Sequence, residues 1–407
     1  MTRTSFRLAV AAAAFALAGA SGTAWAQAKG EGVRPEVGKP LQAASALIKQ
    51  KKGREALAEI AKAEAVGNRT AYENQLIAQM KAAAASASGD ADATIKANEA
   101  LLESGKVSGR EAVTLVQSIA VAYYQKKDYA KAAQWTQRYF KEGGNDGAMR
   151  TMLLQSYYLG NDCNAVSKML GPVTEEGSSH KVTEDELGIL ANCYLRQNDN
   201  GGYVATIEKL VVLYPKKQYW TDLLARVQKK PGFSDRLGVH VFRLKLATGN
   251  LTSAADYMEL AQLALQQGVP AEAKQIVDKG YAAGILGKGE EASRQQRLKD
   301  LINKSLEDSQ KKRAEDEKEA LAAKDGNQLV SVGLNYVYEG KADKGFPLIE
   351  QGIKKGNLKR PEDAKLRFGE AQLSAGRKDA GVKTLKEVKG TDGAADIARL
   401  WVLYARA

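Results

Sequence analysis

The chain is poor in the residues that usually build a catalytic or metal centre. Its 407 residues include only two cysteines and two histidines, His180 and His240. Zinc sites need several Cys or His ligands at short spacing, and no such spacing occurs here. Neither an H-E-x-x-H motif nor a phosphate-binding loop is present, and Ser179 beside His180 lacks a G-x-S-x-G frame. The sequence therefore indicates no catalytic, cofactor-binding or metal-binding residue, and we expect a protein that is not an enzyme.

Proline and runs of β-branched residues are also scarce. The chain has 8 prolines, and Ala, Lys, Glu, Leu and Gln dominate its composition. These residues favour helix almost everywhere. We therefore expect an all-α protein.

The first 26 residues have the features of an export signal. Arg3 and Arg7 precede a short apolar run over residues 8–20, and A-x-A then ends at Ala26, before Gln27. The run is too short to span a bilayer comfortably, and no later stretch is long and apolar enough. We expect cleavage between Ala26 and Gln27 and a soluble protein in a bacterial periplasm or outside the cell. An uncleaved membrane anchor is the alternative.

The chain carries an excess of positive charge. Its formal net charge is +12, and removal of two signal-peptide arginines leaves +10. Export argues against nucleic acid as the partner, and acidic protein segments or anionic envelope polymers are better candidates. The plainer alternative is that the lysines only solvate helix surfaces.

The segment 117–140 shows the repeating unit. Ile119, Ala120 and Tyr123 share one helical face, Lys127-Asp128 breaks the pattern, and a second apolar face starts at Tyr129. A lone helical hairpin cannot bury such faces, so it needs copies on either side. Tyrosines recur in the same phase as Tyr123, at Tyr157 and Tyr194, with spacings of 34 and 37 residues. A period of this length indicates a solenoid.

This pattern resembles the tetratricopeptide repeat, and the later glycine-rich units resemble its Sel1-like variant. The small and aromatic positions that carry the resemblance include Ala120, Tyr123, Ala132, Tyr139, Leu260, Ala261, Ala264, Ala273, Val332, Gly333, Tyr336, Gly345, Gly352, Gly369 and Gly381. The resemblance implies a right-handed α-solenoid of stacked helix-turn-helix units, in an exported protein of Gram-negative bacterial type. It leaves the function open, because such repeats serve many partners.

The repeat phase is interrupted at residues 288–325, which read as one long charged helix. We expect it to be a solvated spacer or, alternatively, a hinge or partner-binding element. The expected order is signal peptide 1–26, disordered lead-in 27–39, N-terminal array 40–287, long charged helix 288–325, and C-terminal repeats with a capping helix 326–407.

The family phasing places Cys163 and Cys193 at the same end of neighbouring units. An oxidising compartment permits a bond between them, so we predict a disulfide closing a loop of roughly 30 residues and adding on the order of 3 kcal/mol. Two buried free thiols are the alternative.

Side chains one helical turn from the core tyrosines are candidates for a ligand-binding concave face. They are Tyr124, Gln155, Tyr158, Asn192 and Arg196. Aromatic rings with amides and an arginine suit an extended peptide or a glycan. An ordinary mixed surface is the alternative. We expect a scaffold or adaptor that binds a protein or peptide of the envelope, and the second possibility is an accessory protein that binds anionic glycan.

Overall fold

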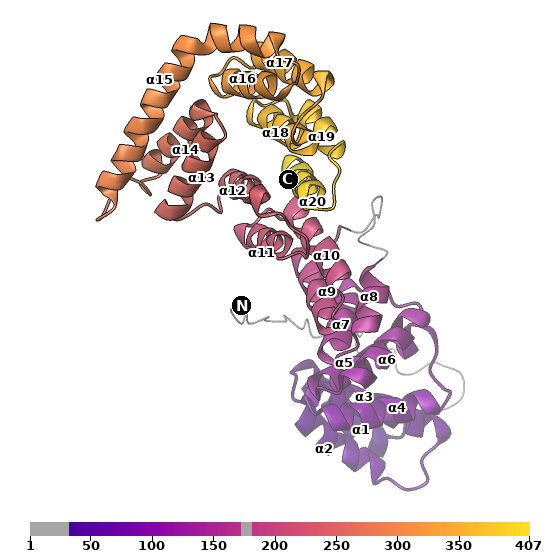
Figure 1. The fold of residues 1–407 in the computed structure, drawn as a ribbon. Helices are drawn as coiled ribbons and strands as arrows, with labels where there is room; N and C mark the ends of the chain where they lie inside the picture. The colour runs from indigo at the N-terminus through magenta and orange to yellow at the C-terminus, as the bar shows by residue number, and fades with distance from the viewer. Residues whose placement is uncertain (1–31, 172–180) are drawn as a thin grey trace. The chain divides into compact units, whose positions relative to one another are not determined.

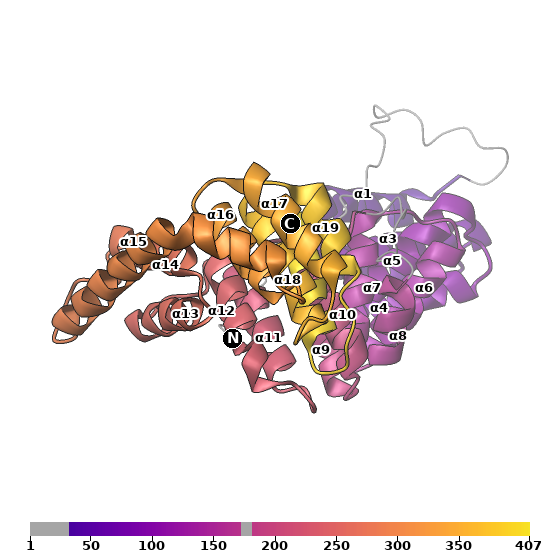
Figure 2. The same ribbon diagram turned by 45° about the horizontal axis from the view of Figure 1, so that its top comes forward.

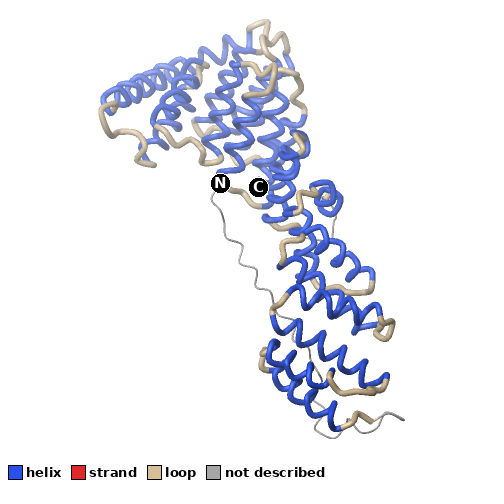
Figure 3. The backbone as a smooth tube through the Cα atoms, turned by 90° about the horizontal axis from the view of Figure 1, so that it is seen from below, coloured by secondary structure: helices blue, strands red, loops and turns tan. Residues whose placement is uncertain are grey.

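The computed structural model describes residues 32–171 and 181–407. Every regular element in these ranges is a helix (Figure 3), so the expected all-α class is confirmed. None of the described helices combines the length and the apolar character that crossing a membrane requires. Consecutive helices pack as antiparallel hairpins, in which each hairpin buries its apolar face against the next.

The chain divides into two compact units, residues 1–165 and 166–407. The helices of the first unit are α1 Pro35–Lys49, α2 Gly53–Glu64, α3 Ala71–Ser88, α4 Ala91–Glu103, α5 Gly109–Gln125, α6 Tyr129–Lys141 and α7 Gly147–Leu159, followed by α8 Cys163–Leu170 at the boundary. The second unit contains α9 Glu184–Arg196, α10 Asn200–Leu213, α11 Lys217–Gln228, the short η2 Asp235–Leu237, α12 Gly238–Ala247, α13 Ala254–Gln266, α14 Pro270–Ala282, α15 Ala292–Ala322, α16 Asn327–Tyr338, α17 Ala342–Lys355, α18 Pro361–Ser374, α19 Lys378–Lys386 and α20 Ala394–Arg406.

The core positions of the hairpin α5–α6 match the sequence pattern. Ala120 and Ala132 are fully buried, and Tyr123 is 8% exposed. Alanine at these positions lets the two helix backbones approach closely. Tyr157 and Tyr194, predicted to be core, are only half-buried.

Four hairpin turns share one construction. A residue with positive φ ends the first helix, and the aspartate after it accepts a hydrogen bond from a backbone N–H in the first turn of the next helix, at 2.9–3.2 Å. Such an N-cap contributes about 1 kcal/mol. The pairs are Gly89-Asp90, Lys127-Asp128, Asn161-Asp162 and Asn198-Asp199.

The first helix begins earlier than the sequence pattern suggests. We expected a disordered lead-in up to residue 39 and a helix start at Pro40, but α1 begins at Pro35 and contains Pro40 in its interior. Pro35 takes the first position, where a missing N–H costs nothing. Val37 is fully buried, and its burial favours this extra turn.

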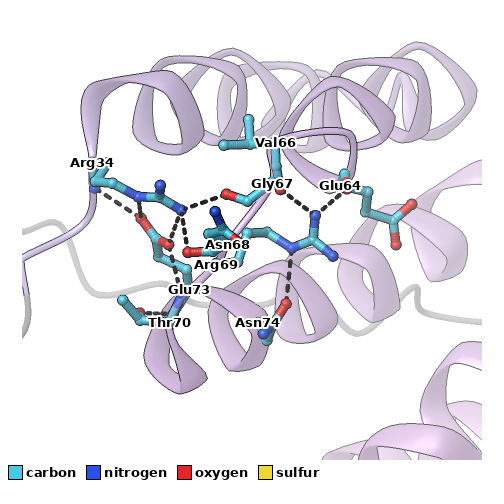
Figure 4. A network of polar contacts seen from close by, with 9 residues as sticks. All are labelled: Arg34, Glu64, Val66, Gly67, Asn68, Arg69, Thr70, Glu73 and Asn74. Carbon is cyan, nitrogen blue, oxygen red and sulfur yellow. Dashed lines mark hydrogen bonds and ion pairs between the residues drawn. The ribbon is translucent and has the colours of Figure 1, made fainter.

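Arg34 fixes the start of α1 to the start of α3 (Figure 4). Its Nε and Nη2 donate to the Glu73 carboxylate at 3.0 and 2.8 Å, and its backbone N–H donates to the same group at 3.0 Å. Glu73 also completes a capping box with Thr70. The hydrogen bonds from Arg34, followed by the one from Thr70, lower the pKa of the buried Glu73 carboxyl from 4.5 to about 2.

In the second unit, glycines bring α16 and α17 into backbone contact. A Cβ added to Gly345 would lie 2.5 Å from the carbonyl oxygen of Gly333, and a Cβ on Gly333 would lie 2.7 Å from the carbonyl oxygen of Gly345. Any larger side chain would force these two helices apart. This contact accounts for the glycines at positions 333 and 345.

The long charged helix α15 is packed against other helices. It contacts α13, α14 and α16 within the second unit. Arg313 is 6% exposed and pairs at 2.6 Å with Glu339, the residue that follows the end of α16. Glu317 accepts from Tyr336 and Lys344. Because Glu317 is bound by these two side chains, the Arg313 guanidinium pairs with Glu339 instead.

The helix α20 does more than cap the preceding hairpin. It packs on α18 and α19 and also reaches back to α10 and α12, so the second unit closes on itself (Figures 1 and 2). Arg399 pairs with Glu208 of α10 at 2.7 Å, and Lys230 pairs with Asp396 at 2.7 Å. One hydrophobic core runs through the closure, from Leu187 to Val402.

Candidate functional site

The predicted concave face is divided between the two units. Tyr124, Gln155 and Tyr158 belong to the first unit, and Asn192 and Arg196 belong to the second. The structure brings together Tyr124 and Gln155, whose side chains form a 2.9 Å hydrogen bond between α5 and α7. Gln155, expected to face a ligand, is only 9% exposed, because its carbonyl oxygen is used in this internal contact.

The other predicted face residues differ in exposure. Tyr158 is half-buried, and Arg196 is exposed near the end of α9. The Asn192 amide donates to the backbone carbonyl of Gly188 at 2.8 Å, one turn earlier in the same helix. A role for this face in binding stays a prediction.

Both cysteines, Cys163 and Cys193, are disulfide-bonded in the structure. The predicted cleavage site at Ala26 and Gln27, and also His180, lie outside the described residues. Within the described ranges, no group of three or more His, Cys, Asp or Glu side chains is arranged to hold a metal ion.

A groove that the sequence did not indicate lies where α20 meets α10 and α11. Its volume is about 630 Å³, in the range of small-ligand sites. We call it the basic groove. Its lining residues with apolar side chains are Val204, Ala205, Leu223, Val227, Pro231 and Leu400.

Cations outnumber anions around the basic groove. Arg226, Lys229, Lys230 and Arg399 line it together with Glu208 and Asp396. Three of the cations have acidic partners, Arg226 with Asp222, Lys230 with Asp396 and Arg399 with Glu208. Lys229 is exposed and forms no ion pair with any described residue, so the groove retains a positive charge that can meet an acidic ligand.

The groove's acidic member Glu208 is partly neutralised by its surroundings. Burial raises the pKa of its carboxyl above the ordinary value, while Arg399 opposes the shift. Arg399 pairs with Glu208 at 2.7 Å, so these two charges compensate each other at this wall.

A second site, formed by side chains of α12, α14 and α18, is built mostly from buried charged residues. We call His240, Arg243, Glu272, Arg367 and Glu370 the charge cluster. The Arg243 guanidinium donates to both carboxylate oxygens of Glu272, at 2.6 and 2.8 Å, and Arg243 is 6% exposed. The His240 ring nitrogen Nδ1 lies 2.8 and 3.0 Å from the two oxygens of Glu370. Two glutamates thus hold two basic side chains in fixed positions.

Glu272 and Arg367 of the charge cluster stay ionised despite burial. Burial favours the neutral form of Glu272, but Arg243 outweighs burial and lowers the pKa of the Glu272 carboxyl. Burial and the neighbouring Arg243 lower the pKa of Arg367 to about 10, which leaves it protonated at neutral pH. Burial and Glu272 raise the pKa of the Tyr338 phenol, so its hydroxyl stays a hydrogen-bond donor.

A pocket of about 310 Å³ opens beside the charge cluster, and we call it the polar pocket. Arg243, Glu272 and Glu370 line it from the cluster. Its remaining lining residues are Leu246, Ala247, Gln275, Ile276, Lys279, Tyr338, Leu373, Ser374, Trp401 and Tyr404. Sequence reasoning missed this site because its members come from five helices that no local motif connects.

Comparisons with known proteins leave the family open. No protein-family model matches the chain, and no curated protein does. Among 29 matching chains of solved structures is the crystal structure of yeast Tom70. It shares 12% identity and a TM-score of 0.25, over 91% of this chain and 95% of that one. A TM-score this low carries no argument about function, and the all-α hairpin architecture rests on the helices of this chain itself.

Proposed function

We propose that the protein is an exported, non-catalytic scaffold that binds an acidic segment of another envelope protein in the basic groove. The supporting observation is the groove itself, which combines an apolar floor with an excess of cations. An extended peptide with one apolar side chain and flanking carboxylates matches both features. The apolar side chain would lie on Leu223, Val227 and Leu400, and the carboxylates would lie near Lys229.

The same groove would also accept part of an anionic polysaccharide by charge alone. The apolar floor favours the peptide, because a polyanionic sugar has no side chain to bury there. Leu223 and Leu400 are 3% and 2% exposed, so the floor is a formed apolar surface and not a row of mobile side chains.

Fluorescence polarisation with defined peptides tests the proposal. The probe is a labelled 12-residue peptide of Asp, Glu and single Leu or Phe residues, and its control replaces every acid with Lys. We expect only the acidic peptide to bind, with an affinity that falls as salt is added. Ala205→Trp, which fills the groove, should abolish binding, and Lys229→Glu should weaken it at least tenfold.

The matched control for the charge change is Lys312→Glu. Lys312 is exposed on α15, outside the groove, so its reversal changes the net charge equally but leaves the site intact. Equal loss in Lys229→Glu and Lys312→Glu would mean that only overall charge matters. Binding of alginate without binding of any acidic peptide would mean that the ligand of the groove is an anionic glycan and not a peptide.

The export of the protein is tested by a separate experiment. If the protein is exported, N-terminal sequencing of the protein purified from cells should begin at Gln27. A sequence that begins before Ala26 would contradict cleavage at this site.

A further inference from the structure

The polar pocket has features of a binding site that the proposed scaffold function does not use. Its charged wall comes from α12, α14 and α18, and Trp401 and Tyr404 on α20 form an aromatic wall. Lys279, Gln275 and Ser374 are exposed and mark its opening. A pocket of about 310 Å³ is at the lower end of the range for small-molecule sites.

One pair in the charged wall is held just beyond hydrogen-bonding distance. Arg243 Nη1 lies 3.5 Å from Glu370 Oε2, although Arg243 is otherwise held by Glu272 and Glu370 is held by His240. An interaction at this distance is weak as a hydrogen bond. A hydroxyl group beside the two could accept from Arg243 and donate to Glu370 at the same time.

The pocket also contains a hydrogen-bond donor without a partner. Trp401 is 6% exposed, and its indole N–H forms no hydrogen bond with any described residue. Leaving a buried donor unsatisfied is costly, so a ligand acceptor at this place would be favoured. The Tyr338 hydroxyl, which stays protonated, supplies a second donor in the same lining.

The charge of the cluster decides which kind of ligand fits. The charged groups that line the pocket, Arg243 and Lys279 against Glu272 and Glu370, balance in sign, so the lining offers donors and acceptors without a large net charge to attract an ion. A balanced lining of this kind favours neither an anionic nor a cationic ligand. A neutral molecule that carries several hydroxyls and one apolar ring face matches the charged wall and the aromatic wall together.

We infer that the polar pocket binds a neutral sugar residue. A sugar hydroxyl lies beside Arg243 and Glu370 and bonds to both, and the apolar face of the ring packs on the side formed by Trp401 and Tyr404. This site is independent of the acidic peptide in the basic groove, since the two sites share only the helix α20. Failure of one proposal therefore leaves the other standing.

Isothermal titration calorimetry and saturation-transfer NMR with the full chain test the inference. The probes are D-glucose, N-acetyl-D-glucosamine and cellobiose. We expect at least one to bind with a millimolar or lower Kd. Tyr338→Phe, which removes one hydroxyl, should weaken that sugar about tenfold, as expected for one hydrogen bond. Ser374→Trp at the opening should abolish binding.

Tyr281→Phe is the matched control. Tyr281 lies on α14, its hydroxyl is also without a hydrogen-bond partner among the described residues, and it does not line the pocket. Sugar binding should be unchanged in this variant and in Ala205→Trp of the basic groove. Circular dichroism confirms that each variant is folded. The inference is overturned if no probe binds the folded wild type at 50 mM or if a bound sugar tolerates Ser374→Trp.

Discussion

The backbone contact between α16 and α17 makes a strong prediction about Gly345. In Gly345→Ala the added methyl group would lie 2.5 Å from the carbonyl oxygen of Gly333 and 3.0 Å from the backbone nitrogen of Val337. Neither main-chain atom can move away alone, so the helices must separate. Overpacking of this kind costs about 1–3 kcal/mol, while alanine gains about 1 kcal/mol over glycine in a helix. Because the opposing atoms belong to the main chain, we expect the upper part of this range and a net loss of about 2 kcal/mol.

Gly188→Ala is the control with the same chemical change. Gly188 lies within α9, and a Cβ there would have nothing within 4 Å. This variant should therefore gain about 1 kcal/mol, so the two substitutions should differ by about 3 kcal/mol and have opposite signs.

Hydrogen exchange resolved by mass spectrometry is the suitable assay. Amide protection reports the opening of each hairpin separately, so it assigns the change to α16 and α17 or to α9. Amides of α16 and α17 should exchange faster in Gly345→Ala and those of α9 more slowly in Gly188→Ala. Unchanged or increased protection of α16 and α17 would refute the reasoning.

Three further predictions follow from contacts described above. Replacing Cys163 and Cys193 with serine should lower the unfolding free energy by about 3.6 kcal/mol in the chain-entropy treatment of a loop of about 30 residues, and urea unfolding of the wild type with and without reductant should show the same difference. The pKa of Glu73 is about 2 in the folded protein against 4.5 ordinarily, so its carboxylate contributes stability above pH 4.5 that is lost as the pH falls toward 2. Thermal melting of Glu73→Gln should therefore depend less on pH than the wild type in this window, and parallel profiles would contradict the assignment. Glu272→Gln should cost about 3–5 kcal/mol because it leaves Arg243 buried without its anion, and urea unfolding should show a smaller loss in the double variant Arg243→Met/Glu272→Leu.

The hairpins could be predicted from the sequence because their determinants are local. Ala120 and Tyr123 lie three residues apart on one face of α5, and Ala132 lies on α6. The structure buries all three. The glycines of α16 and α17 were also part of the sequence pattern, and the structure places Gly333 and Gly345 in the contact between the two helices. The turns also have a local signal, because in three of the four Gly or Asn, which adopt positive φ readily, precedes the capping aspartate.

The two pockets could not be predicted, because their residues are brought together by distant packing. His240 was visible only as a histidine within an apolar helical run, yet its partner Glu370 lies 130 residues further on. Arg313 shows the same limit, since Glu317 lies one turn away on its own helix, yet Arg313 pairs with Glu339 just after α16. Spacing rules describe neighbours on one helix and carry no information about contacts across the unit.

The return of α20 to α10 and α12 also limits how this protein can evolve. An open row of hairpins tolerates the gain or loss of a whole unit, because each contacts only its neighbours. A hairpin gained or lost between α12 and α20 would move α20 away from Glu208 and Lys230. The basic groove and the polar pocket would then both lose the wall that α20 forms. Among related chains, the number of hairpins should therefore vary before α10 and stay constant after it.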